Sequence, residues 1–174
     1  MAETTDSKTQ SDPKAQVWLK PEQIEAMRDA TVSNSADYLS ARNDAVIALL
    51  ADTGLRVGEL AQLNVEHFDP DEGILRLPAD LQKDYPNDNS PEYVEIELDS
   101  ETVRTLQQYL NTRWKDVEAL FPSRQSDRMT KQSVRNVVAN AAENADIAPY
   151  SVKGRGNPSH ITPHTLRHSV AYRM

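Results

Sequence analysis

The sequence predicts a mainly α-helical protein with one small antiparallel β-hairpin or sheet. Apolar residues recur three and four positions apart in several otherwise polar segments, which is the spacing of one buried helix face. Residues 93–98 alternate instead, with Val94, Ile96 and Leu98 on one side, as in a half-buried strand. With 174 residues, the chain is long enough for one domain with its own hydrophobic core.

Composition excludes several classes of protein. The chain has no cysteine, so it has no disulfide framework, no thiol nucleophile and no cysteine-based zinc site. No apolar run approaches the ~20 residues of a membrane span, and the polar N-terminus lacks the core of a signal peptide. We therefore expect a cytoplasmic protein without a membrane partner.

Charge is distributed unevenly along the chain. The net charge is −8, but residues 1–112 carry 9 Lys and Arg against 22 Asp and Glu, whereas residues 113–174 carry 10 against 5. Such a chain can present a basic face to nucleic acid while the rest stays solvated. Arginine outnumbers lysine by 12 to 7, which suits bidentate phosphate contacts. The acidic excess with little lysine also indicates a halophilic, archaeal-like composition.

The first third of the chain predicts a tail followed by two helices. Residues 1–16 are polar, so we expect a disordered tail or linker, with the domain spanning residues 17–174. A first helix is expected with Pro21 near its first turn. A second helix over residues 38–52 is apolar enough to be central, and Gly54 ends it.

The middle of the chain predicts a hairpin and a further helix. Residues 74–77 and 93–98 are expected to pair as antiparallel strands. The polar connection over residues 80–91 carries Lys83 near its start. Ser100 is expected to cap a fourth helix.

The last third predicts two helices separated by a basic loop. Thr130 is expected to cap a helix over residues 131–143. Residues 151–157 are expected to be flexible, and Pro163 opens the final helix. The basic residues of this part are candidate DNA contacts, although a charge run is more often a solvated face: Arg124, Arg128, Lys131, Arg135, Lys153 and Arg155.

Two segments place arginine where a helix begins. His164 and Arg167 are three apart just inside a helix N-terminus, where free backbone N–H groups favour an oxyanion such as phosphate. Arg56 is expected in the first turn of a short helix over residues 55–63, where the helix dipole disfavours a cation. Such a conflict is typical of functional sites. The alternative is a surface arginine paired with a nearby carboxylate.

A metal site is the competing interpretation of the histidines. His160, His164 and His168 are spaced four apart, so one continuous helix would stack their three imidazoles. Pro163 opposes this arrangement, because it places His160 before the helix.

These segments together resemble the catalytic domain of the tyrosine recombinases, the phage integrase family. Thr53-Gly-Leu-Arg56-Val-Gly-Glu59-Leu is similar to the family's first-arginine motif, and His164-Thr-Leu-Arg167-His168 is similar to its second. The order of the intervening elements also fits, and the resemblance covers roughly residues 18–174.

The resemblance implies a role for each matching residue. Arg56 and Arg167 would hold the scissile phosphate and stabilise its charge, and His164 would assist proton transfer. Lys83 would protonate the departing 5′-oxygen, and Glu59 would be a buried acid that orients other groups.

His168 would also support the site. The family needs no metal or other cofactor for this reaction, and its partner is double-stranded DNA. Full-length members act as tetramers on DNA, whereas we expect this chain to be a monomer in solution.

The chain also departs from the family pattern. A second His or Trp and then the nucleophilic tyrosine follow the second motif in the family, and this sequence ends at Met174 before either. Tyr172 lies five positions beyond Arg167, about 140° around the helix, so it is a poor substitute. We therefore expect DNA binding without cleavage. The main alternative is a non-catalytic DNA-binding regulator of the same fold, and a histidine-rich metal-binding protein is less favoured.

Overall fold

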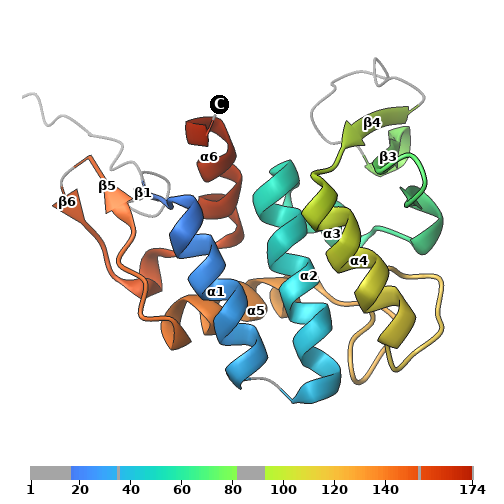
Figure 1. Ribbon diagram of the computed structural model, residues 1–174, viewed down its shortest axis with the longest axis horizontal. Helices are drawn as coiled ribbons and strands as arrows, with labels where there is room; N and C mark the ends of the chain where they lie inside the picture. Colours follow the sequence, from blue (N-terminus) through green and yellow to red (C-terminus); the bar gives the residue numbers. More distant parts are fainter. Residues whose placement is uncertain (1–16, 35, 82–92, 153, 174) are drawn as a thin grey trace, which may run out of the picture.

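The computed structural model describes residues 17–34, 36–81, 93–152 and 154–173 (Figure 1). Its α-helices are α1 (Pro21–Asn34), α2 (Asp37–Thr53), α3 (Val57–Ala61), α4 (Ser100–Thr112), α5 (Lys131–Asn144) and α6 (Pro163–Arg173). Its strands are β1 (Val17–Trp18), β2 (Phe68–Asp69), β3 (Ile74–Pro78), β4 (Tyr93–Glu97), β5 (Tyr150–Ser151) and β6 (Gly154–Arg155). Short 3-10 turns are η2 (Val65–His67), η3 (Ala79–Leu81) and η4 (Pro158–His160). The predicted mainly helical fold with small antiparallel sheets is confirmed.

Helix α2 is the centre of the protein. It lies between α1 and α4 in Figure 1 and also packs against α5 and α6. Val46, Leu49 and Leu50 are fully buried, as its dense apolar sequence predicts for a helix surrounded by others. Gly54 ends the helix in the left-handed conformation, with φ of 69° and its N–H bonded to the carbonyl of Leu50.

Two small antiparallel sheets lie on opposite sides of the helical body (Figure 1). The first has the strand order β2-β3-β4, and its pairing of Leu75 with Ile96 and Leu77 with Val94 confirms the predicted hairpin. The connection that carries Lys83 lies outside the described residues.

The second sheet corrects the sequence-based expectation for residues 151–157. These residues were expected to be flexible, but Ser151 pairs with Gly154 and Tyr150 pairs with Arg155, as strands β5 and β6. The start of the domain joins this hairpin, because Val17 pairs with Ser151 and Trp18 with Tyr150. Strand β1 is thereby held against the segment between α5 and α6.

Helix α3 also begins later than expected. Arg56 has extended backbone angles and is the residue before the helix, so it is not in the first turn. Helix α5 begins as predicted, because the side chain of Thr130 accepts a hydrogen bond from the N–H of Ser133. Among the described residues, no helix combines the length and apolar character needed to cross a bilayer.

Candidate nucleic-acid interface

A pocket of about 440 Å³ lies where the segment between α2 and α3, the start of α3, helix α5 and the start of α6 meet. It brings together three of the predicted site residues with one of the predicted DNA contacts. The lining residues are Leu55, Arg56, Val57, Arg135, Thr162, Pro163, His164 and Arg167. Three arginines and a histidine therefore face one cavity, although Arg56 lies more than a hundred positions before His164 and Arg167 in the sequence.

The turn at Gly54 links the two motif arginines. Its carbonyl accepts a hydrogen bond of 2.6 Å from Nη1 of Arg167, and Arg56 follows two residues later. The left-handed backbone of Gly54 turns the chain toward α6, so that an added Cβ would lie 3.5 Å from Val170 and 3.7 Å from Cγ of Arg167. One turn therefore fixes how both guanidinium groups approach the pocket.

Glu59 fixes the backbone that presents Arg56. Its side chain is buried, and Oε1 accepts a hydrogen bond of 2.8 Å from the N–H of Arg56. An acid in the first turn also complements the helix dipole of α3. Glu59 thus holds the backbone of Arg56. The exposed side chain of Arg56 lines the pocket.

The start of α6 is held by a buried hydroxyl. Thr165 is fully buried, and its Oγ1 accepts a hydrogen bond of 3.0 Å from the N–H of Thr162. The exposed imidazole of His164 lies edge-on against that of half-buried His168, with ring centroids 4.5 Å apart. His164 is thereby presented to the pocket beside Arg167.

The three histidines do not form one stack. His160 belongs to η4, where its Nδ1 accepts a hydrogen bond of 3.3 Å from the N–H of Asn157. The expected effect of Pro163 is confirmed, because α6 begins at that residue. Across the described part of the chain, no three metal-ligating side chains of His, Asp or Glu gather at one point.

The predicted DNA contacts differ in their surroundings. Arg135 lines the pocket, and Lys131 is exposed one turn earlier on α5. Arg124 is exposed and its guanidinium carbon lies 6.0 Å from the ring centroid of Tyr38. Arg155 is exposed on β6 and also donates two hydrogen bonds to the carbonyl of Ala148. Lys153, like Lys83, lies outside the described residues.

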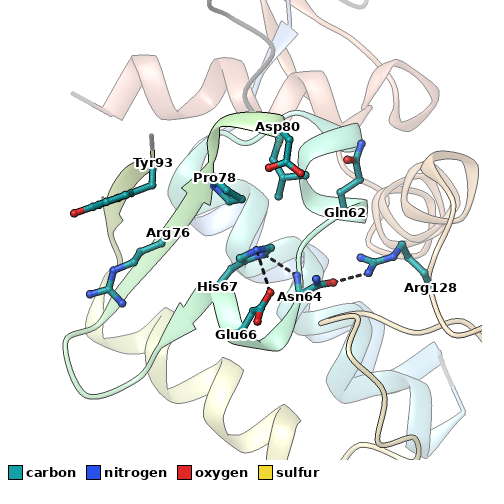
Figure 2. A pocket seen from close by; sticks show the side chains of 10 residues that line it. Gln62, Asn64, Glu66, His67, Arg76, Pro78, Asp80, Tyr93 and Arg128 are labelled. Carbon is teal, nitrogen blue, oxygen red and sulfur yellow. Dashed lines mark hydrogen bonds and ion pairs between the residues drawn. The ribbon is translucent and has the colours of Figure 1, made fainter. Parts of the chain in front are cut away.

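Arg128 has a role within the protein that the charge pattern did not reveal. Its guanidinium donates hydrogen bonds to the carbonyls of Ala61 and Leu63 and to the side-chain oxygen of Asn64 (Figure 2). These contacts join the loop before α5 to the chain that leaves α3. Arginine-to-carbonyl bonds between distant segments leave no local pattern in a sequence, so they could not be predicted.

Arg128 borders a second, larger pocket of about 850 Å³ beneath the β2-β3-β4 sheet (Figure 2). Its cationic side chains are bonded to the protein itself. Besides Arg128, Arg76 forms ion pairs with Asp69 and Glu95, at 3.1 and 3.2 Å. The carboxylates of Glu66 and Asp80 also line this pocket, whereas no acidic residue lines the smaller one, so among the described residues the smaller pocket has the stronger features of an anion site.

Comparison with known proteins identifies the family to which this chain belongs. Residues 17–174 match the model of the phage integrase family. Tyrosine recombinase XerC of Neisseria meningitidis is 30% identical over 162 residues, which are 91% of this chain and 45% of that protein. Tyrosine recombinase XerD of Bifidobacterium longum is 31% identical over 153 residues, which are 82% of this chain and 44% of that protein. The chain thus spans less than half the length of these relatives.

Solved structures share the fold. The crystal structure of XerA recombinase superimposes with a TM-score of 0.65 at 23% identity, over 89% of this chain and 49% of that one. XerH site-specific recombinase bound to its difH substrate gives a TM-score of 0.62 at 19% identity, over 88% of this chain and 41% of that one. Together with the family match, these likenesses show that the chain belongs to the phage integrase family.

Proposed function

We propose that this chain is part of the catalytic domain of a site-specific DNA recombinase. We further propose that its 440 Å³ pocket, which is lined by three arginines, holds a phosphodiester of double-stranded DNA. The observation that carries the proposal is the meeting of Arg56, Arg167 and His164 in one cavity. Guanidinium groups bind the non-bridging oxygens of a phosphate in bidentate fashion, and they stabilise the charge that grows in a five-coordinate transition state.

The proposed reaction breaks and rejoins a DNA strand. A tyrosine oxygen attacks phosphorus, the bond to the 5′-oxygen breaks, and a 3′-phosphotyrosyl intermediate forms. Lys83 gives a proton to the departing 5′-oxygen, and His164 takes the proton that the attacking tyrosine hydroxyl releases and binds a phosphate oxygen. Glu59 positions Arg56 through its backbone, and His168 positions His164 through the ring contact.

The tyrosine is not among the described side chains that line the pocket. We therefore propose that the 174 residues bind DNA without cleaving it.

Positive side chains around the pocket extend the proposed DNA contact. Arg135 supplies a third guanidinium inside the cavity and Lys131 is exposed one turn earlier on α5, whereas Arg124 lies beside Tyr38 at the opposite end of α2. Binding through these groups is electrostatic, so it weakens steeply with salt and discriminates little among sequences.

Duplex binding by the chain tests the first part of the proposal. Fluorescence anisotropy with a labelled duplex should detect binding at low salt, and Arg167→Ala should weaken it about tenfold or more, because a hydrogen bond to a charged group is lost. Arg104→Ala removes one exposed charge from α4 and serves as the matched control. Undetectable wild-type binding at low salt, or equal losses in both variants, contradicts the proposal.

Covalent trapping tests the second part. A longer version of the chain that includes the family's tyrosine should form a protein–DNA adduct on a nicked duplex, visible as a slower band in denaturing electrophoresis. Arg56→Ala in that version should abolish the adduct. A folded longer protein that binds DNA but gives no adduct would instead favour a non-catalytic DNA-binding regulator.

A further inference from the structure

A buried hydrogen bond ties the start of the domain to the helix that carries the second motif. The N–H of Leu19 donates to Oγ of Ser169 over 2.9 Å, across 150 positions of sequence. The same hydroxyl donates to the carbonyl of Thr165 over 2.8 Å. Leu19 is 1% exposed and Ser169 is fully buried, so no water replaces this contact in the folded protein.

The contact lies between two elements that also pack against each other. Leu19 connects β1 to α1, and β1 packs against α6 as well as pairing with β5. The ring of Trp18 stacks on that of Tyr150, with centroids 6.3 Å apart. The first strand is thus fixed on one side by the hairpin before α6 and on the other by α6 itself (Figure 1).

Ser169 lies on the side of α6 that faces away from the pocket. It follows Arg167 by two positions, which is about 200° around a helix, and it follows buried Thr165 by four. Thr165 and Ser169 therefore form one buried polar stripe, while His164 and Arg167 face the cavity. Anything that moves this stripe rotates or shifts both pocket side chains.

We propose that Ser169 is a positioning residue through which the first strand sets the placement of His164 and Arg167. Displacement of residues 17–19 is transmitted through the Leu19–Ser169 bond to α6. Residues 17–19 are thereby coupled to the proposed phosphate site. The expected effect on DNA binding rests on the proposed function, whereas the coupling of residues 17–19 to α6 rests on the fold alone.

Removing the hydroxyl tests the link without any ligand. Ser169→Ala should shift the Arg167 side-chain Nε–H signal in NMR spectra. It should also speed amide exchange at the start of α6, relative to α4, about fivefold or more, the low end of usual coupling between sites. Thr31→Ala is the matched control, because Thr31 is a buried helix hydroxyl whose Oγ1 donates to the carbonyl of Arg28 within α1. An unchanged Arg167 signal and unchanged α6 exchange in a folded Ser169→Ala protein would overturn the proposal.

Coupling must also work in the reverse direction. Duplex DNA should slow exchange of the Leu19 amide of the wild-type chain more than exchange in α4, because linkage between two sites is reciprocal. Ser169→Ala should weaken duplex binding about fivefold or more, and Thr31→Ala should not. DNA binding with equal slowing at Leu19 and α4 would refute the coupling alone. A wild-type chain that binds no DNA would refute the proposed function, and the Arg167 signal would still decide the link.

Discussion

Replacement of Gly54 by alanine should lower the stability of the fold slightly and the affinity for duplex DNA strongly, because Gly54 fixes the geometry of the site. Gly54 has φ of 69°, a conformation that costs an L-residue about 1–2 kcal/mol. An added Cβ meets Val170 at 3.5 Å and Arg167 at 3.7 Å, which are ordinary contacts, so the cost is conformational. Loss of unfolded-state entropy offsets about 0.4–1 kcal/mol of it. The net destabilisation is about 1 kcal/mol, or about 2–4 °C in Tm for a chain of this length.

The effect on DNA should be larger than this loss of stability explains. The Gly54 carbonyl accepts the hydrogen bond from Nη1 of Arg167, so a backbone shift there displaces a guanidinium from the pocket. Duplex affinity, measured by anisotropy well below Tm, should fall about tenfold for Gly54→Ala.

Gly73 provides the control for this measurement. Its φ is 66°, and its added Cβ would meet Val103 at 3.5 Å, so Gly73→Ala imposes a similar strain in the turn between β2 and β3. That variant should lose a similar amount of stability and keep its duplex affinity. Equal affinities for the two variants would refute the proposed role of the Gly54 turn.

Three further outcomes are expected. Arg128→Ala should lower the free energy of unfolding by about 1–3 kcal/mol in denaturant titrations, because the Ala61 carbonyl loses its bond to the guanidinium and the Leu63 carbonyl keeps only its bond from the N–H of Leu120; an unchanged free energy of unfolding would contradict the internal role of Arg128. Burial raises the pKa of Tyr109 from 10.0 to about 12, so the stability it contributes is complete below pH 10 and is lost as the pH rises through about 12. Ultraviolet titration should find one tyrosine that ionises with unfolding, and Tyr109→Phe should remove that step. Leu49→Ala should cost about 2–5 kcal/mol, since Leu49 is fully buried in α2, and a loss below 1 kcal/mol would contradict its central placement.

Local sequence patterns predicted most of the helices and the main hairpin. The alternation of Val94, Ile96 and Leu98 identifies a strand because successive side chains point to opposite faces. Gly54 and Thr130 mark helix ends because each satisfies a local backbone requirement. The meeting of Arg56 with Arg167 was anticipated by resemblance, since no local pattern relates them.

Non-local contacts could not be predicted. Strands β1, β5 and β6 have two residues each, too few to show alternation, and their pairing joins residues 17–18 to residues 150–155. The start of α3 was misplaced because Arg56 is an unusual residue before a helix, although Glu59 three positions later carries half of a capping signal. The internal role of Arg128 depends on carbonyls more than sixty positions away.

A double-mutant cycle on duplex binding tests the central claim most directly. If Arg56 and Arg167 hold one phosphate, the losses in Arg56→Ala, Arg167→Ala and the double variant should be non-additive, with a coupling energy of about 0.5–3 kcal/mol. The isotherms would be measured at one low salt concentration. Losses that add to within about 0.3 kcal/mol would mean that the two guanidinium groups act on separate parts of the DNA, and the proposed phosphate site would be wrong.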